Sequence, residues 1–118
     1  MTRTQGIIGT IGLAGALFLF AGTGGSISGD EAKALVRDGA LLLDVRTPEE
    51  FAAGHVGGAV NIPVQQLEAA LGTFPAREDQ DIVVYCQSGR RSANAAGILQ
   101  RAGYSKVHDL GPRSNWKP

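Results

Sequence analysis

The single cysteine of this chain, Cys86, lies in a setting that favours nucleophilic chemistry. It follows the apolar, β-branched run Ile82-Val83-Val84-Tyr85 and opens the loop Cys86-Gln87-Ser88-Gly89-Arg90-Arg91, after which a helical pattern begins at Ser92. The N–H groups of such a loop, the N-terminus of the following helix and the charge of either arginine would all stabilise a thiolate. We therefore expect a cysteine with a lowered pKa that acts as a nucleophile.

The length of this loop favours one kind of cysteine chemistry over another. Four residues separate Cys86 from Arg91, whereas cysteine phosphatases place one more residue between cysteine and arginine to wrap a phosphate group. The shorter loop favours a smaller anionic group, such as a sulfur atom carried on Cys86. A cysteine phosphatase or an arsenate reductase stays open as the less favoured alternative.

Strands and helices alternate along the chain and would place Cys86 at one edge of a sheet. Apolar runs at 41–45, 59–62, 81–85 and 106–108 predict strands, and helical spacing predicts helices over 30–37, 48–54, 67–71 and 92–102. Gly111-Pro112 is expected in a loop that borders the site. This alternation is typical of an α/β fold, and we expect one domain with a small, mostly parallel five-stranded sheet flanked by helices. Such sheets bind ligands at the carboxyl ends of their strands, where Cys86 lies.

Composition excludes several classes of function. The 118 residues suffice for one domain, and a formal net charge of zero gives no electrostatic support for binding nucleic acid. One cysteine cannot form an internal disulfide, and one cysteine with two distant histidines gives no metal-binding spacing. We therefore expect no metal site.

The first 27 residues differ from the rest of the chain. Arg3 is the only charged residue before Asp30, and residues 7–21 are apolar or small, with further small residues up to Ser26. This pattern predicts a cleaved signal peptide or an uncleaved membrane anchor over residues 7–27, with a buried helix of the domain as the least favoured alternative. In the first two cases the domain of residues 28–118 is exported to the periplasm or another compartment outside the cytoplasm, tethered to the inner membrane if the segment stays uncleaved.

Three separated blocks resemble the rhodanese-like sulfurtransferases. The loop that starts at Cys86 fits the family pattern Cys-x-x-Gly-x-Arg. The block Leu43-Asp44-Val45-Arg46-Thr47-Pro48-Glu49-Glu50-Phe51, with its continuation to Pro63, fits a second hallmark, and residues 102–116 resemble the C-terminal part. With its leader, the chain is most similar to small secreted single-domain members of the phage-shock protein E type.

The resemblance implies a two-step sulfur transfer without a metal or organic cofactor. Cys86 would take the outer sulfur of a small anionic donor such as thiosulfate, release sulfite, and pass the sulfur from a persulfide to cyanide or a thiol. A module that only carries persulfide, or docks to a protein partner with little turnover of its own, is the first alternative. We expect a monomer.

The resemblance also assigns roles around Cys86. Arg91 would hold the loop and Arg90 would meet the anionic donor. Asp44 and Arg46 would support the site without direct catalysis. The loop residues expected to bind the substrate and the persulfide are Gln87, Ser88, Gly89, Arg90 and Arg91.

Overall fold

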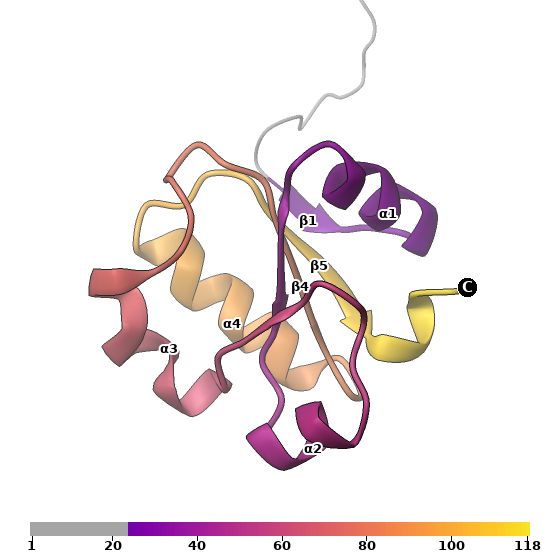
Figure 1. Cartoon of the computed structure of the whole chain (residues 1–118). Coiled ribbons are helices and arrows are strands. Elements are labelled where there is room, and N and C mark those ends of the chain that lie inside the picture. The colour runs from indigo at the N-terminus through magenta and orange to yellow at the C-terminus, as the bar shows by residue number, and fades with distance from the viewer. Residues whose placement is uncertain (1–23) are drawn as a thin grey trace, which may run out of the picture.

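The structure is a computed structural model and describes residues 24–118. Five parallel strands form its centre (Figure 1). Their order across the sheet is β1-β5-β4-β2-β3, and every neighbouring pair is parallel. This arrangement confirms the predicted α/β fold with a five-stranded sheet. The strands are β1 (Gly24–Ser26), β2 (Leu41–Asp44), β3 (Val60–Asn61), β4 (Ile82–Cys86) and β5 (Val107–Pro112).

Four α-helices flank the sheet. Helix α1 covers one face, α3 and α4 cover the other, and α2 lies near the edge at which the strands end (Figure 1). Capping boxes start α1 at Ser28 and α2 at Thr47, because each hydroxyl accepts the third backbone N–H of its helix and a glutamate there accepts the N–H of the cap. The helices are α1 (Gly29–Arg37), α2 (Pro48–Ala53), α3 (Val64–Ala70) and α4 (Arg90–Arg101), with the short 3₁₀ turns η1 (Leu71–Thr73) and η2 (Arg113–Asn115).

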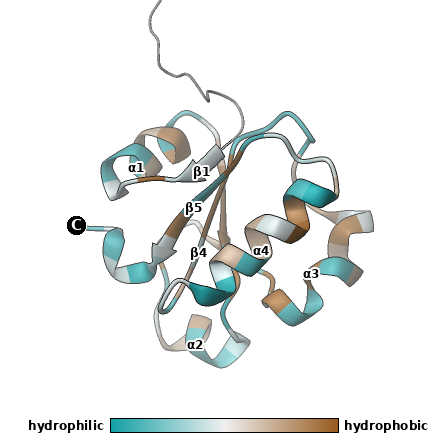
Figure 2. Ribbon diagram, turned by 180° about the vertical axis from the view of Figure 1, so that it is seen from behind, coloured by the Kyte–Doolittle hydropathy of each residue, from teal (hydrophilic) through white to brown (hydrophobic). Residues whose placement is uncertain are grey.

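Strand β4 is buried on both faces, as its continuously apolar sequence predicts. Ile82, Val84 and Cys86 belong to the core beneath α3 and α4, whereas Val83 and Tyr85 belong to the core beneath α1. Figure 2 shows the hydrophobic colouring of these central strands. The alternation places the Cys86 sulfur on the α4 side of the sheet, in front of the first turn of that helix.

The first strand was not predicted, and it begins before the expected start of the domain. Residues 24–26 were assigned to the leader, but they pair in parallel with β5, with Ser26 opposite Asp109. Glycine and serine carry no apolar pattern, so only the partner strand reveals this element. The leader predicted over residues 7–27 lies largely outside the described residues. No helix within residues 24–118 is long and apolar enough to cross a membrane.

Helix α3 begins at Val64, three residues before the predicted start at residue 67. Two further differences from the predicted boundaries lie beside Cys86. Helix α4 begins at Arg90 rather than at Ser92, because Gly89 adopts a left-handed conformation (φ 105°) and turns the chain into the helix two residues earlier. Strand β5 runs on to Pro112 instead of ending at His108, with a register shift opposite Val84 and Tyr85. The Gly111-Pro112 pair is therefore part of the sheet, not of a loop.

Candidate active site

Cys86 ends strand β4 and is fully buried. The backbone turns through residues 87–89 into α4, and the N–H of Gly89 donates a hydrogen bond to the Cys86 sulfur at 2.9 Å. The left-handed conformation of Gly89 makes this turn possible, since an L-residue with a side chain is disfavoured there. The expected nest of N–H groups around the sulfur is thus present in the structure.

Several donors converge on the Cys86 sulfur. Burial by itself raises the pKa of this thiol, but hydrogen bonds from the Ser92 hydroxyl and from the N–H groups of Ser92, Gly89 and Ser88 outweigh burial, so the pKa lies below the usual value for cysteine. The thiolate form is favoured accordingly. A buried thiolate surrounded by donors is suited to nucleophilic attack and to carrying an anionic persulfide.

Ser92 was not among the predicted site residues. Its side chain is buried in the first turn of α4, and its single hydroxyl proton has two acceptors within reach, the Gly89 carbonyl oxygen at 3.0 Å and the Cys86 sulfur. The sequence contained one usable signal, a small hydroxyl residue immediately after the arginine pair. The predicted helix start at Ser92 concealed this signal. In the structure Ser92 is the third residue of α4 and not its first.

Arg91 forms a bidentate ion pair with Glu50 of α2. Its Nη1 and Nη2 atoms lie 2.7 and 3.1 Å from the two carboxylate oxygens. The Arg91 hydrogen bond lowers the pKa of Glu50 to about 2, and Glu50 also accepts the N–H of Thr47 at the start of α2. Arg91 therefore connects the start of α4 to α2. Glu50, like Ser92, is a residue of the site that was not predicted from the sequence.

Asp44 and Arg46 form a buried ion pair at the end of β2. The Arg46 Nη2 atom lies 2.7 Å from Asp44 and also donates to the Gly54 carbonyl at 2.8 Å. Its Nη1 atom donates to the side-chain oxygen of Gln87 at 3.3 Å, so the pair orients a residue of the active-site loop. This geometry agrees with the supporting role expected for both residues.

Tyr85, on the neighbouring strand β4, packs against this ion pair. The guanidinium of Arg46 lies 5.7 Å from the centre of the Tyr85 ring. Burial raises the pKa of Tyr85 to about 12, so its hydroxyl stays protonated while it accepts the Val56 N–H at 3.1 Å. Tyr85 thereby connects the segment 55–57 to the centre of the sheet.

Arg90 differs from Arg91 although the two are adjacent. Its side chain is exposed, and none of the ion pairs found among residues 24–118 involves it. A cation at the first position of α4 without a partner is available to an incoming anion. The predicted contact of Arg90 with a donor anion stays a prediction.

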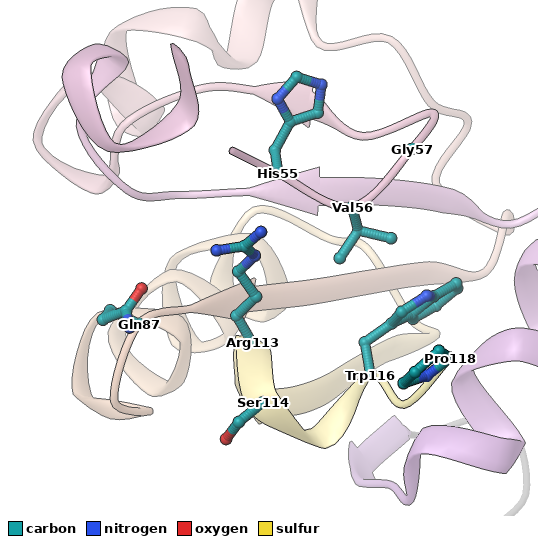
Figure 3. Close-up of a pocket in the computed structure, with 8 residues that line it drawn as sticks. All are labelled: His55, Val56, Gly57, Gln87, Arg113, Ser114, Trp116 and Pro118. Atoms are coloured by element: carbon teal, nitrogen blue, oxygen red, sulfur yellow. The ribbon is translucent and has the colours of Figure 1, made fainter. Parts of the chain in front are cut away.

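A cleft of about 510 Å³ lies beside the loop (Figure 3). The segment 55–57 forms one wall, Arg113, Ser114 and Trp116 form the other, and Gln87 lies at one end. The His55 ring stacks on Phe51 with the ring centroids 3.6 Å apart, and its Nδ1 lies 2.8 Å from the Phe51 carbonyl oxygen.

The described part of the chain brings no three His, Cys, Asp or Glu side chains together in a way that could hold a metal ion.

Comparison with known proteins agrees with this architecture. Thiosulfate sulfurtransferase PspE of Escherichia coli is 38% identical over 69 residues, which cover 58% of this chain and 66% of that protein. Human thiosulfate:glutathione sulfurtransferase is 39% identical over 93 residues, covering 68% of this chain and 81% of that protein. The solved structure of the human single-domain sulfurtransferase TSTD1 superimposes with a TM-score of 0.69 at 35% identity, covering 80% of this chain and 94% of that one.

The similarity to the E. coli relative thus spans just under two thirds of that protein, 66% of its length. A family model, described as the rhodanese-like domain, matches residues 28–117. Because this match includes the parallel sheet from β2 to β5 and the complete Cys86 loop, the chain belongs to the rhodanese-like domain family.

Proposed function

We propose that this protein is a thiosulfate sulfurtransferase that carries sulfur as a persulfide on Cys86. The observation that carries the proposal is the buried sulfur at the end of β4, with the Gly89 N–H at 2.9 Å and a lowered pKa. Relatives named thiosulfate sulfurtransferase in E. coli and sulfurtransferases in humans support sulfur transfer as the reaction class.

In the first step, the Cys86 thiolate attacks the outer sulfur of thiosulfate. A bond forms between the two sulfurs, the S–S bond of thiosulfate breaks, and sulfite leaves with the electron pair. The N–H groups that stabilise the thiolate then surround the new persulfide. Arg90, which is exposed at the start of α4, attracts the anionic donor.

In the second step, an acceptor removes the outer sulfur. A nucleophile such as cyanide or a thiolate attacks the outer sulfur of the persulfide, and the electron pair of the broken S–S bond returns to Cys86. The low pKa of Cys86 makes it a good leaving group. The human relative carries glutathione in its name, which supports a thiol as one class of acceptor.

Sulfite release from thiosulfate in the presence of cyanide tests the proposal. The full chain should release sulfite with turnover, and C86S should release none while retaining its unfolding transition. The mass of the protein after incubation with thiosulfate alone should increase by one sulfur atom. Persulfide formation without turnover would favour the carrier alternative, and Cys86-dependent hydrolysis of an aryl phosphate would favour a phosphatase.

We further propose that the domain acts as a monomer outside the cytoplasm, exported by its N-terminal segment. The apolar run of residues 7–21 behind Arg3 supports export. N-terminal sequencing of the protein isolated from a fractionated cell distinguishes a cleaved leader from an anchor. Sedimentation equilibrium of the same material determines the oligomeric state.

A further inference from the structure

The cleft beside the loop contains an arginine without an acidic partner. No ion pair within residues 24–118 involves Arg113, and no aspartate or glutamate is found among the residues that line the cleft. An unpaired guanidinium in a concave surface whose lining, which extends to Pro118, contains no acidic side chain contributes a positive potential there. The cleft is therefore suited to a ligand that carries negative charge.

Strand register places the backbone of this arginine beside the end of strand β4, although Cys86 itself is not among the residues that line the cleft. Cys86 lies opposite Pro112 in the β4–β5 pair, and Arg113 is the next residue. Gln87, which follows Cys86, lines the same cleft. Gln87 and the wall that begins at Arg113 thus follow the ends of the same strand pair, and a molecule in the cleft has one end beside the active-site loop.

The guanidinium of Arg113 is positioned by packing. A Cβ atom at Gly54 would lie 3.2 Å from Nη2 of Arg113, so the absence of a side chain at Gly54 gives the guanidinium its room. Figure 3 shows the side chain extending from the start of η2 toward the segment that carries His55 and Val56, between Gln87 and Trp116. Arg113 therefore points across the cleft and not into bulk solvent.

The size and lining of the cleft favour an organic molecule over the donor anion. Its volume of about 510 Å³ lies within the range of roughly 300–1,000 Å³ that small-molecule sites occupy. Trp116 contributes an aromatic wall, which suits carbon atoms better than the oxygens of thiosulfate. The second substrate of the reaction is thus the better occupant.

We propose that the cleft binds the sulfur acceptor, a small thiol that bears a carboxylate, and that Arg113 binds this carboxylate. The inference rests on the proposed function. The acceptor thiol first loses its proton to water, the outer sulfur of the anionic persulfide takes up a proton from water, and the acceptor thiolate attacks that sulfur. The Cys86 S–S bond breaks, its electron pair returns to Cys86, and the acceptor leaves as a hydropersulfide. Arg113 is a specificity residue that positions the acceptor.

Three small thiols that share the group HS–CH2–CH2 and differ in charge test the charge preference. They are 3-mercaptopropionate, 2-mercaptoethanol and cysteamine, which are anionic, neutral and cationic, respectively. In R113A, kcat/KM for 3-mercaptopropionate should fall about tenfold, the loss expected when a charged hydrogen bond worth about 1.4 kcal/mol is removed. The kcat/KM for 2-mercaptoethanol should change by less than about twofold, as should the value for thiosulfate.

Control variants separate this role from a structural one. R113E should reverse the preference in favour of cysteamine, and R113K should restore part of the activity with 3-mercaptopropionate. Arg101, an exposed arginine in the last turn of α4, offers a matched control, and R101A should change no acceptor preference.

Two results would overturn the inference. An equal loss with all three thiols would make Arg113 a structural residue, and a loss confined to thiosulfate would place it in the donor site. If the wild-type protein releases no sulfite with any acceptor, the proposed sulfurtransferase function fails. A charge preference that is absent from an active wild-type protein refutes only the acceptor site.

Discussion

The arginines around Cys86 divide into two groups that occupy different regions. Behind the loop, Arg46 and Arg91 are each paired with a carboxylate at 2.7 Å. On the open side of the site, Arg90 and Arg113 have no ion-pair partner within residues 24–118. Paired arginines hold elements in place, because their charge is already satisfied, whereas unpaired ones are available to anions. The same side chain thus has a structural use in one region and a binding use in the other.

The largest expected effect comes from breaking the buried pair. In D44A, Arg46 would retain its charge with only the oxygens of Gly54 and Gln87 as acceptors. The free energy of unfolding should fall by about 3–5 kcal/mol, because an uncompensated buried charge remains. Urea unfolding monitored by circular dichroism measures this loss.

The exposed pair of Arg37 and Asp38, 3.8 Å apart, supplies the control. D38A should leave the urea midpoint nearly unchanged. D44N, which keeps one oxygen acceptor for Arg46, should lose less stability than D44A. A loss below about 1 kcal/mol in D44A would show that the buried pair does not hold the site together.

The adjacent arginines of α4 allow a sharper comparison. R91A should lower the free energy of unfolding by about 1 kcal/mol and reduce turnover, because the start of α4 loses its attachment to α2. R90A should leave stability unchanged and raise the KM for thiosulfate. Thermal unfolding and steady-state kinetics of both variants provide the measurements.

The partner glutamate tests whether the pair acts as a unit. E50Q should resemble R91A, and the double variant should lose less stability than the sum of the two single losses. Additive losses would mean that Arg91 and Glu50 act independently despite their bidentate contact.

The pKa of Cys86 shows whether hydrogen bonds or nearby cations stabilise the thiolate more. Removing the Ser92 hydroxyl should raise the pKa of Cys86, so the alkylation rate of S92A should rise at higher pH than that of the wild type. Below the wild-type midpoint the rate should fall about fivefold, as expected for a lost hydrogen bond of about 1 kcal/mol. The rate of labelling with iodoacetamide is measured for the wild type and S92A at a series of pH values from about 5 to about 9.

Two variants complete this experiment. Ser105 is exposed and remote from the sulfur, so S105A should keep the wild-type profile. R90A should move the midpoint less than S92A does. A larger shift in R90A would show that the unpaired cation, and not the hydroxyl, controls the thiolate.

The smallest effect concerns acid stability. The pKa of Glu50 is about 2 in the folded protein against a usual 4.5, because Arg91 stabilises the carboxylate. A lowered carboxyl pKa contributes stability that is fully present above pH 4.5 and lost as the pH falls to 2. The stability difference between wild type and E50Q should therefore shrink over this interval. A difference that stays constant down to pH 2 would contradict the assigned ion pair.

Much of the fold follows from local sequence patterns. The apolar runs before Asp44 and Cys86 predict buried parallel strands, and both strands occur with boundaries within one residue of the prediction. The predicted helices over 30–37 and 48–54 likewise occur as α1 and α2, with boundaries within one residue of the prediction. These signals are strong because each arises from residues that are neighbours in the chain.

Elements that depend on a partner were predicted less well. Strand β1 has the sequence Gly-Gly-Ser, and its extended pairing exists only beside β5. The continuation of β5 through Gly111-Pro112 likewise depends on its register with Tyr85 and Cys86. Neither segment has an apolar alternation that could indicate a strand.

The nucleophile and its loop are determined by the sequence, since a lone cysteine between a buried strand and a Gly-Arg-Arg turn already predicts a stabilised thiolate. The separation of the arginines into paired and unpaired ones is determined by the tertiary structure. Glu50 reaches Arg91 across 41 residues because β2 and β4 are neighbours in the sheet, and Arg113 enters the cleft because β5 ends opposite Cys86. Ion pairs form between charged groups that are close in space, and the spacing of residues along the chain does not indicate that distance.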